Sequence, residues 1–139
     1  MKISELAVGE SASITRMVTD SDVNKFAEVT GDYNLIHMDE EWAAATPQKG
    51  RIVHGMLLAS FISAVIAMKL PGAGTIIQGQ ELRFMLPARI GDEITATVRV
   101  REVLTEYNTA ILAISCTNQE GRKLVTGIAT VLPPTESQN

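Results

Sequence analysis

Residues 31–39 bring together side chains suited to proton transfer. Asp32, Asn34 and His37 lie within this short polar stretch, which we expect to form a tight loop after a helix. An imidazole is the side chain best matched to proton transfer near neutral pH, and a carboxylate can share that work when partial burial keeps it basic. Asp32 and His37 are therefore candidate acid–base residues. The same stretch is also consistent with an Asx-type turn, and with His37 as a core histidine bonded to a carbonyl.

A second candidate lies where the most apolar stretch of the chain begins. Residues 56–68 contain only two polar side chains, Ser60 and Ser63, and a Pro-Gly pair follows them. A helix that is apolar on every side must be enclosed, and this one is too short for a membrane span, which needs about 20 apolar residues. Its free N–H groups and positive dipole end, beginning at Gly55, can hold a developing negative charge.

The rest of the chain must position these two segments. A strand is predicted over residues 11–18, a helix over 20–30 and a short helix over 40–46. After Gly72 the pattern changes to period two with many β-branched residues. It predicts four strands, over residues 75–84, 92–103, 109–118 and 123–132. Short turns separate them, so we expect an antiparallel meander that the first strand can join.

A curved antiparallel sheet around one apolar helix is the hot-dog architecture, of the α+β class. We expect residues 1–139 to form a single domain. The strand at residues 109–114 is apolar on both faces, which favours a homodimer that covers or extends the sheet. The polar tail, residues 133–139, is expected to fray.

Composition excludes several classes of protein. The net charge of −4, with no basic stripe, argues against nucleic-acid binding. The first residues lack the apolar run of a signal peptide, so a cytoplasmic protein is expected. Cys116 is the only cysteine and is interpreted as a small core residue. One cysteine, two histidines and scattered carboxylates form no recognisable metal-ligating pattern, so we expect no metal and no cofactor.

Residues 31–39, followed by Ile-Val-His-Gly-Met at 52–56, resemble the MaoC-like hydratase family and, more narrowly, its short (R)-specific enoyl-CoA hydratases. The family pattern is Asp-x-Asn-Pro-(Ile/Leu)-His-x-Asp, followed by His-Gly-Met at the start of the central helix. The resemblance continues through residues 57–60, 70–72, 86–87 and 91–93, and so covers nearly the whole chain. Leu35 stands where the family has proline, which loosens the backbone before the histidine.

The resemblance implies cofactor-free, syn addition of water to a trans-2-enoyl-CoA, giving the (R)-3-hydroxyacyl-CoA. Asp32 and His37 would act together on the water, in an order that the residues leave open. The Gly55 N–H would hold the charge on the thioester oxygen. Asn34 would orient the loop or the water, and Ser63 would give polar support near the site.

Several assignments have structural alternatives. His54 is interpreted as a structural residue that holds the segment before the helix. Ser63 can instead bond back to its own helix, and Gly55 can simply permit a tight turn. Four basic residues are candidates for the phosphates of coenzyme A or are solvated surface charges: Lys49, Arg51, Arg83 and Arg89. Ile62 and Ile66 either line the acyl pocket or belong to the core.

Three other functions are compatible with the fold. A dehydratase acting on an acyl-carrier-protein thioester is disfavoured because few basic residues cluster to dock an acidic carrier. A hot-dog thioesterase usually places its carboxylate differently. A non-catalytic acyl-CoA sensor would not need Asp32 and His37. As a hydratase, the protein would supply 3-hydroxyacyl-CoA from fatty-acid oxidation to polyester (polyhydroxyalkanoate) synthesis or a related pathway.

Overall fold

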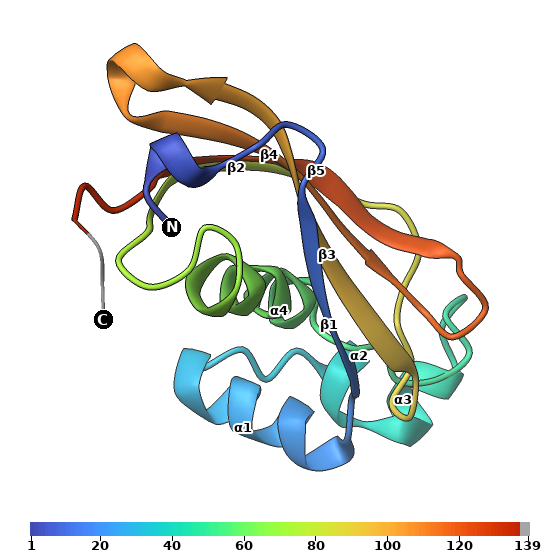
Figure 1. Cartoon of the computed structure of the whole chain (residues 1–139). Helices are drawn as coiled ribbons and strands as arrows, with labels where there is room; N and C mark the ends of the chain where they lie inside the picture. Colours follow the sequence, from blue (N-terminus) through green and yellow to red (C-terminus); the bar gives the residue numbers. More distant parts are fainter. Residues whose placement is uncertain (137–139) are drawn as a thin grey trace.

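One curved antiparallel sheet and one central helix organise the molecule. The computed structural model describes residues 1–136. Its helices are α1 (Asp20–Thr30), α2 (Leu35–Met38), α3 (Glu40–Ala44) and α4 (Gly55–Met68). Its strands are β1 (Ser11–Met17), β2 (Ile76–Phe84), β3 (Glu93–Leu104), β4 (Thr109–Thr117) and β5 (Lys123–Leu132). Figure 1 shows the sheet curving over α4, with α1 on the opposite side of that helix.

The strand order is β1-β3-β4-β5-β2, with every neighbouring pair antiparallel. The predicted meander of four consecutive strands is therefore wrong for β2, which pairs with β5 and not with β3. β1 occupies the free edge of β3, so β2 takes the opposite edge and the chain then crosses the molecule. This crossing segment passes the start of α4, where the Val53 N–H donates to the Ala88 carbonyl at 2.8 Å.

The central apolar helix is confirmed, and most of its side chains are enclosed. Leu58, Ile62 and Ile66 of α4 are at most 2% exposed. They belong to one core with the inward side chains of the sheet, which alternate with outward ones along β3 and β4 as period two predicts. One side of α4 is open in the single chain, because Met56 is 56% exposed.

The caps of the first long helix follow the predicted pattern. Thr19 and Asp22 form a reciprocal capping box at the start of α1, and Gly31 ends it in the left-handed conformation with φ of 78°. The short helix after Asp39 ends at Ala44 and not at residue 46. No helix within residues 1–136 is long and apolar enough to cross a membrane.

Two smaller predictions have different outcomes. Cys116 is buried, and burial raises the pKa of its thiol to about 12, which fits the predicted role as an inert core residue. The predicted fraying of the tail is wrong at Pro133, which is buried and whose carbonyl accepts a hydrogen bond from Asn108 Nδ2 at 2.8 Å. Residues 137–139 of that tail lie outside the described part of the chain.

Candidate active site

The segment predicted as a loop contains a turn of helix, α2, which carries His37. Side-chain caps explain the difference, because an isolated turn is too short to show helical periodicity. The Asp32 Oδ1 atom accepts from the Asn34 N–H at 3.2 Å, and Asn34 Oδ1 accepts from the Ile36 N–H at 3.2 Å. Asx-type bonding and a functional role are therefore compatible here. Leu35 is the first residue of α2. Proline, which the family has here, is favoured at this position because the N–H of the first helical residue has no partner within the helix.

The ring of His37 is held by a main-chain carbonyl. Its Nδ1 lies 2.8 Å from the Ile52 oxygen. A carbonyl oxygen can only accept a hydrogen bond, so Nδ1 carries the proton and Nε2 of the neutral ring is bare. The half-buried His37 thus presents a basic nitrogen, as an acid–base role requires.

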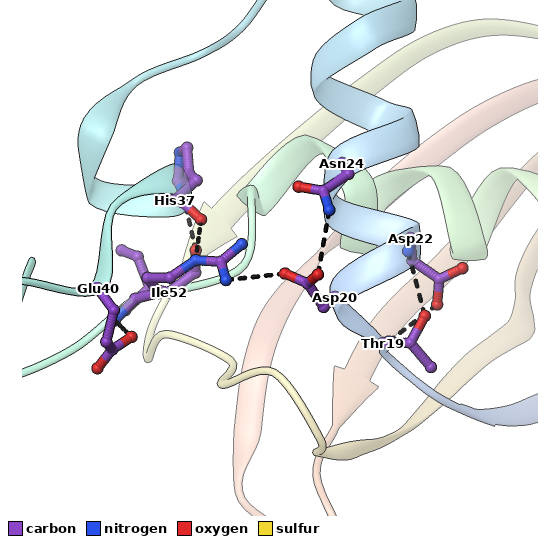
Figure 2. A network of polar contacts seen from close by, with 8 residues as sticks. Thr19, Asp20, Asp22, Asn24, His37, Glu40 and Ile52 are labelled. Atoms are coloured by element: carbon purple, nitrogen blue, oxygen red, sulfur yellow. Dashed lines mark hydrogen bonds and ion pairs between the residues drawn. The ribbon is translucent and has the colours of Figure 1, made fainter.

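Arg51 holds the backbone of α2, and Figure 2 labels its partners His37 and Asp20. Its Nε donates to the His37 carbonyl at 2.6 Å, and its Nη1 pairs with Asp20 of α1 at 2.8 Å. The next residue, Ile52, donates its N–H to the Ile36 carbonyl at 3.1 Å. Residues 51 and 52 therefore fix both the main chain and the ring of His37.

These contacts change the interpretation of the four basic candidates for coenzyme A phosphates. Two guanidinium atoms of Arg51 are used within the chain. Arg89 donates to the carbonyls of Gln48 and Gly50, the latter at 3.1 Å. Lys49 and Arg83 are exposed and remain the better candidates.

His54 contacts both candidate catalytic residues, which its spacing in the sequence did not predict. It is 2% exposed, and its Nε2 donates to the main-chain carbonyl of Asp32 at 3.0 Å. Its ring centroid lies 4.0 Å from that of His37 and 4.9 Å from that of Phe26. Burial lowers the pKa of His54; a hydrogen bond to the Asp32 carbonyl opposes this, and the charge of His37 lowers it further.

Folding thus adds His54 to Asp32 and His37, the pair that the sequence had already placed together. One carboxylate oxygen of Asp32 and one ring nitrogen each of His37 and His54 all lie within 4.8 Å of one another. One nitrogen of each ring is already engaged by a main-chain carbonyl, that of Ile52 for His37 and that of Asp32 for His54. The two rings lie 4.0 Å apart between centroids, with planes inclined at 30°. Chemistry without a metal or other cofactor stays a prediction.

His37 and Gly55 line one cavity of about 480 Å³, together with Met56, Phe84 and Leu86. α4 begins at Gly55, and Gly55, Met56 and Leu58 of its first turn line this cavity. A Cβ atom at Gly55 would lie 2.7 Å from Cδ1 of Phe84, so a side chain would displace the aromatic ring. Asp32 is exposed and is not among the residues that line this cavity. It is close to the site because one of its carboxylate oxygens lies within 4.8 Å of a ring nitrogen of His37.

Ser63 lies elsewhere in the single chain. It lines a groove of about 310 Å³ between α4 and β2, with Met56 as the residue common to both cavities. The supporting role predicted for Ser63 therefore stays a prediction. Ile62 and Ile66 line neither cavity and belong to the core.

The fold and the site define a hot-dog protein of the α+β class, in which an imidazole and the start of the central helix line one cavity and a carboxylate lies close to that imidazole. Its sequence matches the family described as MaoC like domain over residues 7–117. The chain belongs to this family.

Individual relatives agree with that placement. The chain is 42% identical to the (R)-specific enoyl-CoA hydratase of Rhodospirillum rubrum over 130 residues. The aligned region covers 94% of this chain and 90% of that protein. The solved R-hydratase PhaJ1 from Pseudomonas aeruginosa has a TM-score of 0.91 at 42% identity, over 97% of this chain and 86% of that one. The (R)-hydratase from A. caviae involved in PHA biosynthesis has a TM-score of 0.91 at 40% identity, over 94% and 98%.

Proposed function

We propose that this protein is an (R)-specific enoyl-CoA hydratase that adds water to trans-2-enoyl-CoA without a cofactor. The observation that carries the proposal is the shared cavity of His37, with its bare Nε2, and Gly55, at the start of α4. The relatives named as (R)-specific hydratases support the substrate class and the stereochemistry.

The reaction needs a base, an acid and a site for negative charge. As the water oxygen bonds to the β-carbon, His37 Nε2 or the Asp32 carboxylate takes a water proton, and a proton from this pair goes to the α-carbon. Negative charge develops on the thioester oxygen, which the Gly55 N–H can stabilise. Both new bonds form on the face that meets Asp32 and His37, which makes the addition syn.

The active form that we propose is a homodimer. Met56, Phe84, Met85 and Leu86 line the His37 cavity and are each 46–56% exposed in the single chain. β2 is an edge strand next to them, with Ile76 61% exposed. A second copy would cover this apolar surface and close the cavity. We also propose a cytoplasmic location and a supply of 3-hydroxyacyl-CoA from fatty-acid metabolism for polyhydroxyalkanoate synthesis.

Purified protein mixed with crotonyl-CoA tests the proposal. We expect loss of the enoyl absorbance without release of free thiol, and (R)-3-hydroxybutyryl-CoA as the product. Thiol release would instead indicate a thioesterase, and no change would indicate a sensor. A much higher rate with the carrier-protein thioester in the reverse direction would favour the dehydratase.

Two variants test the proposed acid–base residues in the same assay. Asp32→Asn and His37→Gln should each lower kcat by about 10²–10⁴-fold, because each removes a proton-transfer group. Both should keep the circular dichroism spectrum and elution volume of the wild type. Near-normal turnover in either variant would contradict its catalytic role.

A further inference from the structure

We infer that His54 is a positioning residue for this reaction, which acts by holding Asp32 through its carbonyl and His37 through its ring face. The inference rests on the proposed hydratase function. It assigns the two histidines opposite tautomers, each imposed by a different main-chain carbonyl.

The contact with Asp32 comes from outside the local turn. The Asp32 N–H donates to Thr30 Oγ1 at 3.1 Å, and its Oδ1 accepts from the Asn34 N–H, so both bonds stay within residues 30–34. The His54 Nε2 bond to the Asp32 carbonyl instead connects this turn to the segment that leads into α4. It therefore fixes the turn relative to the oxyanion-binding end of the helix.

The contact with His37 fixes the orientation of the imidazole. Ile52 holds the His37 ring at Nδ1, while the His54 ring lies 4.0 Å away on its face. Phe26 of α1 in turn packs against His54 at 4.9 Å. Together these contacts restrict the direction in which His37 Nε2 points, and small errors in such a direction are costly to catalysis.

The tautomers follow from the acceptors. Because both partners are carbonyl oxygens, His37 is protonated at Nδ1 and His54 at Nε2. His54 Nδ1 is then a bare, buried nitrogen without a hydrogen-bond partner among the described residues. A neutral His54 is an advantage in this place, since a second positive charge beside His37 would oppose proton uptake by that ring.

Nuclear magnetic resonance tests the tautomers directly, because the chain has only two histidines. In protein labelled with ¹⁵N-histidine at pH 8, we expect one ring to show the Nδ1–H pattern and the other the Nε2–H pattern. His37→Gln and His54→Phe assign the two sets of signals. An Nδ1–H tautomer at His54, or a mixture of both forms, would overturn the inference whether or not the protein hydrates crotonyl-CoA.

Kinetics test the positioning role with two complementary variants. His54→Phe keeps an aromatic ring but loses the donor to Asp32, whereas His54→Gln keeps a donor but loses the ring. We expect each to lower kcat by about 10- to 100-fold while KM changes by less than about twofold. Val98→Ala in the core of β3 is the control for general loss of packing.

The outcomes separate the possible failures. If both His54 variants lose no more kcat than Val98→Ala, His54 is only a structural residue and the inference is wrong. If the wild type does not hydrate crotonyl-CoA at all, the proposed function fails, while the tautomer measurement still decides the geometry of His54.

Discussion

Gly55 shows how closely single residues constrain this site. Its α-carbon lies where a methyl group would come within 2.7 Å of the Phe84 ring, on the wall that also carries His37. Gly55 is the first residue of α4 and is not among the glycines with positive φ. The position therefore does not need the backbone freedom of glycine. Space is the reason, because a Cβ atom would meet Phe84, and the proposed approach of a substrate carbonyl to the helix N–H groups needs the same room.

Gly55→Ala should therefore lower kcat/KM by about 10-fold or more, either by pushing Phe84 into the cavity or by keeping the carbonyl away from the N–H. A double variant with Phe84→Leu distinguishes these effects. If the displaced ring is the cause, the double variant recovers activity relative to Gly55→Ala. Crotonyl-CoA hydration by Gly55→Ala, Phe84→Leu and the double variant gives the coupling energy between positions 55 and 84. Full activity of Gly55→Ala would contradict the proposed approach of the substrate carbonyl to the Gly55 N–H.

His54 should also make stability depend on pH. Burial lowers its folded-state pKa below the ordinary value of 6.5, and the neighbouring groups that carry charge are His37 and Asp32. Below about pH 6.5 the unfolded chain then binds more protons than the folded chain, so stability is full above this pH and falls as pH falls towards the folded pKa.

Urea unfolding at fixed protein concentration checks this sign. Between pH 7.5 and 5.5 the wild type should lose more stability than His54→Phe, by at most about 1.4 kcal/mol per pH unit for one proton. His37→Gln serves as the comparison for the other imidazole. Equal losses in the wild type and His54→Phe would show that His54 does not contribute.

At the scale of elements, the active site depends on how α2 is attached to its neighbours. α2 is a single turn and cannot be stable alone. Arg51 connects the His37 carbonyl of α2 to Asp20 of α1. The Asp20 carboxylate also accepts a hydrogen bond from Asn24 Nδ2 at 3.1 Å (Figure 2). The Arg51 side chain is 16% exposed, whereas that of Asp20 is 59% exposed.

This asymmetry predicts unequal effects of two substitutions. Arg51→Met should destabilise the protein by about 1–3 kcal/mol and lower kcat, because it leaves the partly buried His37 carbonyl without its donor. Asp20→Asn should cost less than about 1 kcal/mol, because an exposed ion pair contributes little. Thermal unfolding and crotonyl-CoA turnover measure both, and equal effects would mean that the ion pair and not the carbonyl contact holds α2.

The elements also show what sequence patterns can and cannot predict. The thirteen-residue apolar stretch and the period-two segments predicted α4 and the strands well, because burial on a helix or sheet leaves a periodic trace. α2 left no such trace, since its stability comes from caps and from Arg51. The place of β2 depends on which sheet edge is free, and alternation within a strand carries no information about that edge.

The residues of the candidate site also fall into those that the sequence predicted and those that only the fold brings together. Asp32, His37 and Gly55 were predicted from residue types and motif spacing; the structure places His37 and Gly55 on one cavity, and their catalytic roles stay predictions. His54 was predicted to be structural only, because its contacts with Asp32 and His37 span 22 and 17 positions in sequence and exist only after folding. Arg51 looked like a surface cation for the same reason.

At the scale of the whole molecule, one face of the chain remains uncovered. Phe84 ends the edge strand β2, Met85 and Leu86 follow it, and all three form an exposed wall of the His37 cavity. A cavity with an open apolar wall would admit water to the enolate-like intermediate and bind an acyl chain weakly. A second copy packed on this wall would remove both problems. We therefore expect a variant that weakens the dimer to lose activity as well.

Met85→Glu tests that coupling, because a carboxylate in a dimer interface would be desolvated without a partner. We expect the wild type to be a dimer by analytical ultracentrifugation and Met85→Glu to shift towards monomer with a loss of hydration activity. Val29→Glu is the matched control, since Val29 is an apolar residue of α1 that is 85% exposed. It should keep both dimer and activity. A monomeric wild type with full turnover would show that the single chain closes its own cavity, whereas an equal effect of both variants would place the interface elsewhere.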